Sequence, residues 1–257
     1  MKAAFKYIYG PVPSWRLGSS LGIDPISKGK KVCTFDCVYC QIGKTELLTD
    51  KREVFVKVSD IVEEFDSLPR LEIDYMTFSG TGEPTLAKNL GQMIKALRKI
   101  RSEKIAVFTN SSLMHRKDVQ DDLFKADLVI AKLDAPVQNI FELVNQPART
   151  VKIDVIIKAI KNFKSCYLGK LALQIMFMAQ NKKYAKNIAD ITREIKPDEV
   201  QLNTPLRPCR IKPLTETEMN TIEEYFSGLN VTSVYKAEKR RVNPISSKDT
   251  LKRRGKI

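Results

Sequence analysis

The sequence predicts an α/β fold: a partial (β/α)6 barrel with a basic C-terminal extension. Short apolar runs typical of strands alternate with segments whose apolar residues have helical spacing. Polar or glycine-rich residues follow most predicted strands, at the end where parallel α/β sheets carry their chemistry. The chain has 257 residues, of which 43% are hydrophobic, so it can bury the core of one large domain and is not disordered throughout.

The predicted elements follow one another as βα units. The first strand covers residues 19–23, and a helix at 59–68 begins at Ser59 and ends before Pro69. Further strands are predicted at 75–79, 105–109, 128–133, 171–178, 199–202 and 231–235. Further helices are predicted at 90–100, 119–124, 151–163, 184–195 and 215–226, the last with a capping box of Thr215 and Glu218.

Serial βα units build a parallel sheet with helices outside, and six units are too few to close an eight-stranded barrel. We therefore expect an open barrel over residues 1–235, with a long cysteine-bearing loop at 24–45. Residues 236–257 form the predicted basic extension.

The charge is concentrated at the two ends of the chain. The formal net charge is +14, with +7 in residues 236–257 and +5 in residues 1–58. A nearly neutral body with basic ends favours a polyanionic partner, with RNA (tRNA) as the first candidate. The clusters at 239–241 and 252–254 lack interleaved aromatic residues, so they suit phosphate contacts without base stacking. Solvated surface charges are the alternative.

Targeting signals are missing from the sequence. No run of about 18 apolar residues occurs, and the first ten residues lack a signal-peptide core. We expect a cytoplasmic protein without a membrane partner. The five cysteines therefore do not indicate disulfides.

Three of these cysteines, Cys33, Cys37 and Cys40, lie within eight residues. Three thiolates at this spacing can converge on one soft metal centre. A structural zinc ion requires a fourth ligand, and the single histidine, His115, is far away in sequence. An iron–sulfur cluster usually has four cysteines as well, so three ligands would leave one iron open. From the residues alone, both kinds of centre remain possible.

The spacing C-x3-C-x2-C, with Tyr39 before the last cysteine, resembles the signature of the radical S-adenosylmethionine (SAM) superfamily. The resemblance implies a [4Fe-4S] cluster on Cys33, Cys37 and Cys40, with the amino and carboxylate groups of SAM on the open iron. It also implies reductive cleavage of SAM to methionine and a 5′-deoxyadenosyl radical. Tyr39 would then lie near the adenine.

A second motif agrees with the first. The run Ser79, Gly80, Thr81, Gly82 and Glu83 is similar to the Gly-Gly-Glu element of the same superfamily, whose backbone carbonyls bind the methionine ammonium of SAM. Glycines would let that backbone approach the ligand closely. The run lacks the Gly-Lys-Ser/Thr of a phosphate loop.

Three further residues follow later strands. Asn110 and Asp134 are predicted to bind the ribose hydroxyls or the methionine carboxylate, with turn and helix capping as the alternative. Cys209 lies between Arg207 and Arg210, which would favour its thiolate, and it is a candidate catalytic hydrogen-atom donor or covalent holder. The two arginines could bind a substrate carboxylate or phosphate.

A narrower resemblance extends over nearly the whole chain. The segments 9–18 (YGPVPSWRLG) and 201–209 (QLNTPLRPC) are similar to segments of archaeal and bacterial Fe–S oxidoreductases described as relatives of wyosine-type tRNA synthases. Wyosine synthases proper carry extra N-terminal cysteines, whereas no cysteine precedes Cys33 here. We therefore expect a relative of those enzymes rather than the same activity.

The resemblance as a whole predicts a radical SAM enzyme that modifies RNA, with SAM and an electron donor such as ferredoxin or flavodoxin as partners. Radical modification of a peptide or protein, including glycyl-radical activation, or of a small metabolite is the alternative. A non-catalytic Fe–S redox protein is a third reading, but simple electron transfer needs no ammonium site of the kind predicted at Gly80–Glu83.

Overall fold

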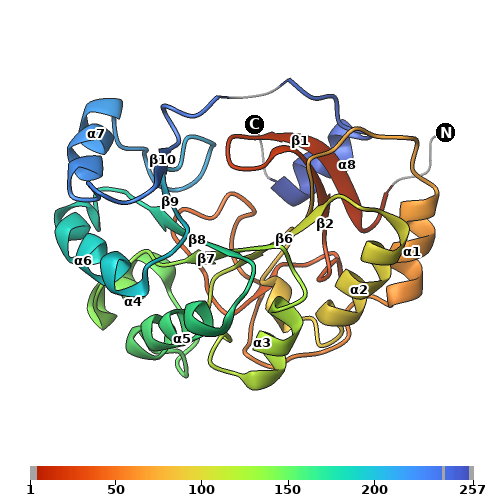
Figure 1. Cartoon of the computed structure of the whole chain (residues 1–257), viewed down its shortest axis with the longest axis horizontal. Coiled ribbons are helices and arrows are strands. Elements are labelled where there is room, and N and C mark those ends of the chain that lie inside the picture. The colour runs from red at the N-terminus through yellow and green to blue at the C-terminus, as the bar shows by residue number, and fades with distance from the viewer. Residues whose placement is uncertain (1–4, 239–240, 255–257) are drawn as a thin grey trace.

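The computed structural model describes residues 5–238 and 241–254, which form a curved sheet covered by helices on its outer face (Figure 1). The main sheet has the order β1-β2-β5-β6-β7-β8-β9-β10. Its strands are β1 (Ile8–Ser14), β2 (Gly18–Ile23), β5 (Tyr75–Phe78), β6 (Lys104–Thr109), β7 (Leu128–Lys132), β8 (Lys170–Met176), β9 (Glu199–Asn203) and β10 (Val231–Ser233). The first pair, β1 with β2, is antiparallel, and every later pair is parallel.

Helices follow most parallel strands along the chain. They are α1 (Val58–Asp66), α2 (Leu90–Ile100), α3 (Lys117–Leu123), α4 (Gln138–Asn145), α5 (Ile153–Cys166), α6 (Ala185–Ile195), α7 (Glu216–Glu224) and α8 (Ser247–Arg254). Two short 3-10 turns, Pro84–Leu86 and Lys182–Tyr184, and a two-stranded sheet of β3 (Val32–Cys33) and β4 (Leu47–Leu48) complete the fold. In the described ranges, no helix has the length and apolar character needed to cross a bilayer.

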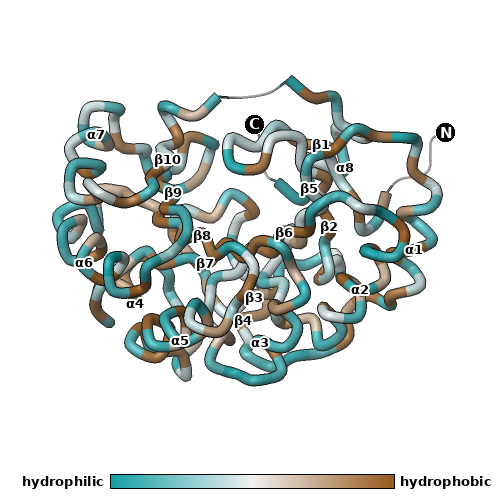
Figure 2. Tube along the Cα trace, viewed as in Figure 1, coloured by the Kyte–Doolittle hydropathy of each residue, from teal (hydrophilic) through white to brown (hydrophobic). Residues whose placement is uncertain are grey.

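The sheet buries an extensive apolar face under the helices, and its inner face carries a small apolar core and polar side chains. Alternate residues of β6 separate the two sides: Ile105 and Val107 join the large core under the helices, whereas Ala106 joins a small core inside the barrel with Leu17 and Ile130. Figure 2 shows apolar stretches along the central strands and hydrophilic ones along the outer helices. The cavity of the barrel is therefore left to polar residues nearer the carboxyl ends of the strands.

The predicted strands and helices are present, with ends shifted by a few residues. The capping box of Thr215 and Glu218 is formed as predicted. Five strands and helices of the described ranges were missed: β1, β3, β4, α4 and α8. Strand β1 contains Pro11 and Pro13, which read against a strand but are tolerated at the edge of a sheet. Helix α4 is short, and it adds a helix between β7 and α5.

The basic extension, predicted from its charge to contact a polyanion or to be solvated, is in part packed on the barrel. Its helix α8 packs against β1, and Gly10 N donates to Thr250 Oγ1 at 3.0 Å while Ile245 N donates to Gly10 O at 2.6 Å. The charged segment therefore packs on the edge strand β1 and satisfies backbone groups of that strand. Lys239 and Arg240, which belong to the first predicted basic cluster, lie outside the described residues. Residues 255–257 of the extension also lie outside them.

Candidate radical SAM site

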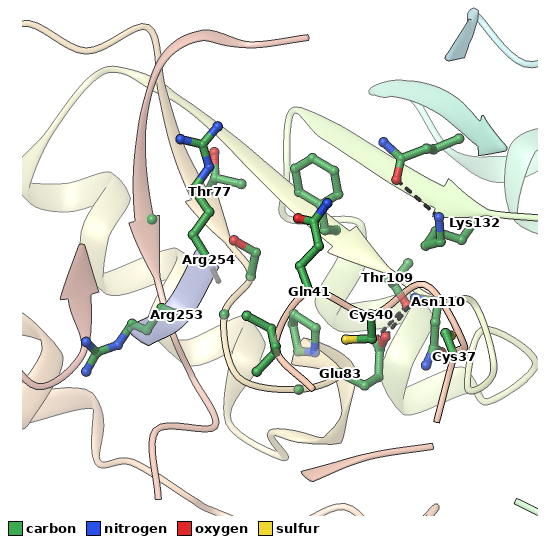
Figure 3. A pocket seen from close by; sticks show the side chains of 18 of the residues that line it. Cys37, Cys40, Gln41, Thr77, Glu83, Thr109, Asn110, Lys132, Arg253 and Arg254 are labelled. Atoms are coloured by element: carbon green, nitrogen blue, oxygen red, sulfur yellow. Dashed lines mark hydrogen bonds between the residues drawn. The ribbon is translucent and has the colours of Figure 1, made fainter. Parts of the chain in front are cut away.

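One cavity of about 310 Å³ lies within the curve of the sheet, near the carboxyl ends of its strands. Most of the predicted site residues line it: Cys33, Cys37, Tyr39, Cys40, Ser79, Gly80, Gly82, Glu83 and Asn110. The close-up in Figure 3 shows Cys37 and Cys40 beside Glu83 and Asn110. The structure thus brings the two motifs together, although they are some forty residues apart in sequence. Thr81, Asp134 and Cys209 do not line the cavity.

The cysteine loop is held by backbone pairing on two sides. On one side Val32 N donates to Thr81 O at 3.3 Å, and Glu83 N donates to Val32 O at 3.2 Å. A Cβ on Gly82 would lie 1.8 Å from Val32 O, so only glycine allows this approach. On the other side Val38 N donates to Val144 O at 3.0 Å, at the end of α4. Gly82 of the glycine-rich turn therefore allows the cysteine loop to pack closely against that turn.

Polar groups surround the three thiols. Asn110 Nδ2 lies 3.6 Å from Cys33 Sγ, and Asn145 Nδ2 lies 3.5 Å from Cys37 Sγ. Burial acts against the charge of Lys31, but the neighbouring thiols of Cys40, Cys33 and Cys37 raise its pKa above the ordinary value. N–H donors and a cation beside the sulfurs favour the thiolate form.

Without a metal, burial opposes the thiolates. It raises the pKa of Cys33, with Glu83 adding to the effect, and together with Cys40 it raises the pKa of Cys37 to about 11. A coordinated thiol is deprotonated outright by the metal. The donors at Lys31 and the two asparagines then stabilise the resulting negative charge.

The donor set fits a cluster better than a single ion. Within the described residues, no three Cys, His, Asp or Glu side chains come close enough together to hold one metal ion. The three thiols border one common cavity. Such an arrangement is suited to a multi-iron cluster in which each sulfur binds a different iron.

The glycine-rich turn rests on a buried carboxylate. Gly80 has φ +130°, and a Cβ there would lie 2.4 Å from Asp24 Cγ. Asp24 Oδ2 accepts from Thr81 Oγ1 at 2.7 Å and from Thr81 N at 3.2 Å, and Arg253 Nε of α8 lies 3.6 Å away. Thr81 therefore points away from the cavity, and its role here is to hold the turn.

Glu83 ties the end of β5 to the end of β6. Its carboxylate accepts from Thr109 Oγ1 at 2.7 Å, from Asn110 N at 2.7 Å and from Thr85 Oγ1 at 2.7 Å (Figure 3 shows the first two). Burial raises the pKa of Glu83, although these hydrogen bonds act in the opposite direction. The side chain thus fixes the relative position of the two strand ends that border the cavity.

The carboxylate of Asp134 contacts Tyr39 of the cysteine loop and Asn145, which lies beside that loop. It accepts hydrogen bonds from Tyr39 Oη, from Asn145 Nδ2 at 2.8 Å and from Met176 N at 2.8 Å, and Lys132 Nζ lies 3.4 Å away. Burial and the charge of Asp134 raise the pKa of Tyr39 well above its ordinary value. Asp134 therefore orients Tyr39, which lines the cavity, and does not itself reach it.

Cys209 lies apart from this network. Its Sγ donates to Ile211 O at 3.2 Å, and the side chain is half-buried outside the cavity lining. Of its two neighbours, Arg207 lines the cavity and Arg210 is exposed. The catalytic role predicted for Cys209 stays a prediction.

Comparison with known proteins now decides the family. Residues 30–191, more than half of the chain, match the Radical SAM superfamily. The chain belongs to the radical SAM superfamily. Membership makes it a radical SAM enzyme and implies a [4Fe-4S] cluster and SAM.

Among curated relatives, this radical SAM chain is 39% identical to a UPF0026 protein of Synechocystis, with 83% of this chain and 80% of that one covered. It is also 34% identical to a protein named GTPase Obg of Brachyspira hyodysenteriae, over 97% of this chain, but it spans only 38% of that protein. The UPF0026 match does not support the predicted link to wyosine-type synthases in particular.

Solved structures agree on the fold. SuiB of Streptococcus suis, bound to the precursor peptide SuiA, superposes with a TM-score of 0.64 and 17% identity over 85% of this chain and 50% of that one. Archaeal TYW1 superposes with a TM-score of 0.58 and 13% identity over 84% of this chain and 74% of that one. At these identities the likeness shows the fold of the radical SAM domain alone.

Sequence reasoning missed several residues of this radical SAM site. Lys31 and Asn145 contact the cysteine loop, and Arg16 and Arg254 line the cavity. A signal for Asn145 existed: the apolar residues of 140–144 have helical spacing and precede Pro147, which could have marked the end of α4. No comparable sequence signal brings Arg16 and Arg254, 238 positions apart, to one cavity.

Proposed function

We propose that this chain holds a [4Fe-4S] cluster on Cys33, Cys37 and Cys40 and cleaves SAM beside it to generate a radical that attacks the substrate. The carrying observation is that these three thiols share one cavity with the Gly80–Glu83 turn. When bound and reduced, the cluster supplies the electron that splits the sulfonium of SAM into methionine and a 5′-deoxyadenosyl radical.

The protein's own residues would position the reactants. Lys31, Asn110 and Asn145 stabilise the charge on the sulfurs. Backbone carbonyls of the Gly80–Glu83 turn would accept from the ammonium of SAM. Tyr39, held by Asp134, would border the adenine. Apolar and polar walls of the half-enclosed cavity would limit the access of water to the radical.

RNA, and tRNA in particular, is the proposed substrate class, supported by the net charge of +14. A peptide or a small metabolite is the second candidate. The peptide is supported by a structural neighbour of the same fold that is bound to a precursor peptide. A ferredoxin or flavodoxin would supply the electron, in the cytoplasm.

The function is tested by reconstituting the chain anaerobically with iron and sulfide, reducing it with dithionite and adding SAM. We expect slow formation of 5′-deoxyadenosine, measured by mass spectrometry, and its loss in Cys37→Ala. Cys166→Ala, at the exposed end of α5, is the matched control and should retain the activity. A cluster that is shown to be reduced, with SAM bound and no cleavage, would favour the non-catalytic reading.

A further inference from the structure

Four arginines line the cavity of the cysteines: Arg16, Arg207, Arg253 and Arg254. Arg16 lies in the turn between β1 and β2, Arg207 follows β9, and Arg254 belongs to α8. In Figure 3, Arg254 lies across the cavity from Cys40, with Gln41 between them. The cavity therefore has a sulfur-bearing end and a guanidinium-bearing end.

Arg207 and Arg254 donate to backbone oxygens, Arg16 contacts aromatic rings, and none of the three guanidinium groups has a carboxylate partner among the described ion pairs. Arg207 Nη1 donates to Arg254 O at 2.7 Å, and Arg254 Nη2 donates to Pro13 O at 3.0 Å. The guanidinium of Arg16 stacks on Trp15, 4.6 Å from the ring centroid. Backbone carbonyls and rings hold these groups in place without removing their charge.

Their electrostatics are unfavourable in the absence of an anion. Burial lowers the pKa of Arg16, and repulsion from Arg207 and Arg254 lowers it further, against a smaller effect of Glu199. Burial and Arg254 likewise lower the pKa of Arg207. Arginine keeps its charge at neutral pH, so the lowered pKa values mean that the folded protein holds three mutually repelling, partly buried positive charges.

The neighbouring Arg253 shows what a structural arginine looks like here. Its side chain is 2% exposed, and it pairs with Asp24, which is fully buried. It also donates to the backbone oxygens of Lys6 and Asp249. One arginine of α8 thus has carboxylate and carbonyl partners, while the next, Arg254, turns toward the cavity without a carboxylate.

Unpartnered polar atoms in the wall are of one kind. In the described lining, the buried side-chain nitrogens without a hydrogen-bond partner are Arg16 Nε, Arg16 Nη1, Gln174 Nε2 and Arg253 Nε, and no buried lining oxygen is in that state. Arg253 Nε faces the carboxylate of Asp24, whereas the nitrogens of Arg16 and Gln174 have no such counter-charge. Buried polar groups normally have partners, so a set of free donors indicates an acceptor that the ligand brings. Guanidinium forks match the paired oxygens of a phosphate.

We infer that Arg16, Arg207 and Arg254 bind a phosphate group of the substrate and thereby hold the substrate between themselves and the cysteines. This phosphate site deepens the proposed function, and the position of the bound substrate relative to the radical rests on that function. The same cavity must also hold the cluster and SAM, so its arginine end suits one phosphate of a nucleotide or sugar phosphate, free or at one position of an RNA.

The test uses the cluster-loaded chain and inorganic pyrophosphate as the probe, with acetate as the carboxylate comparison. Calorimetry should show pyrophosphate binding that weakens about tenfold or more in Arg16→Gln and in Arg207→Gln. Arg207→Lys keeps the charge without the fork and should fall between. Arg210→Gln, exposed and outside the lining, is the matched control and should bind as the wild type does.

A second readout separates ligand binding from a structural role. Because Arg207→Gln relieves repulsion, the ligand-free variant should melt at the same temperature as the wild type or higher. If Arg207 had only a structural role, the Arg207→Gln variant would melt at a lower temperature than the wild type. A lower melting temperature together with unchanged pyrophosphate binding overturns the inference. Absence of pyrophosphate binding in the wild type, or acetate binding as tightly, also overturns it.

Competition identifies the source of the phosphate. Displacement of pyrophosphate by adenosine monophosphate supports a free nucleotide, displacement by tRNA alone supports a polymer, and displacement by neither overturns the inference. If saturating SAM abolishes pyrophosphate binding, the arginines hold the SAM carboxylate and the inference fails. Failure of SAM cleavage in the wild type would refute the proposed function and leave the phosphate site standing.

Discussion

Replacing Arg253 by methionine should destabilise the protein, because it leaves the carboxylate of Asp24 buried without its cation. The two side chains are 2% and 0% exposed, and their charged atoms lie 3.6 Å apart. Removing one member of a buried pair costs about 3–5 kcal/mol. Asp24 retains hydrogen bonds from Thr81 and Ile26, so we expect the lower end, about 3 kcal/mol.

For a chain of this size the loss corresponds to a fall in melting temperature of about 6–12 °C. Differential scanning calorimetry of the cluster-loaded protein measures it, with Lys252→Met, an exposed neighbour on α8, as the matched control. The control should stay within about 0.5 kcal/mol of the wild type. The double variant with Asp24→Asn should recover part of the loss, because neither buried charge then remains.

The pH dependence gives a further check on the same pair. Burial raises the pKa of Asp24 in the folded state, although its hydrogen bonds and Arg253 lower it. A carboxyl whose folded pKa exceeds its unfolded value of about 3.9 destabilises the fold above that value, and the penalty fades as the group is protonated. The deficit of Arg253→Met should therefore shrink as the pH falls toward 4. A loss below about 1 kcal/mol, or one that grows at low pH, would refute this account of the pair.

Three other predictions follow from the site and its supports. Asn145→Ala should lower the iron retained after reconstitution and speed cluster loss in air, because it removes a donor to Cys37; Asn187→Ala, exposed on α6, is the control, and equal iron content in both would contradict it. Gly82→Ala should block cluster assembly and lower the melting temperature, because its Cβ would overlap Val32 O; normal iron content would contradict that packing. Truncation after residue 244 should lower the melting temperature, since α8 packs on β1; an unchanged melting curve would instead indicate a free extension.

The sequence contained the order of the fold and the chemistry of its first motif. Periodicity predicted the serial βα units, and the spacing of Cys33, Cys37 and Cys40 predicted that they share a site. Position after a strand predicted that Gly80, Gly82, Glu83 and Asn110 lie at the cavity, because carboxyl ends of parallel strands meet at one edge, whereas Thr81 turns away from it.

The position of a residue after a strand did not predict the direction in which its side chain points. Asp134 also follows a strand, yet its carboxylate turns to Tyr39 and Asn145, the latter on a helix that was not predicted. The basic extension illustrates the other limit. Its composition suggested polyanion contact or solvated charges, whereas Arg253 pairs with Asp24 and the segment makes a hydrogen bond to β1. Contacts between segments more than 200 residues apart leave no local pattern to read.

We propose that three cysteines leave one iron of a [4Fe-4S] cluster open for SAM. Electron paramagnetic resonance of the dithionite-reduced protein, recorded with and without SAM, tests this proposal. We expect a reduced-cluster signal whose g values change when SAM is added, and the loss of that signal in Cys33→Ala. A reduced-cluster spectrum that is the same with and without saturating SAM would contradict it.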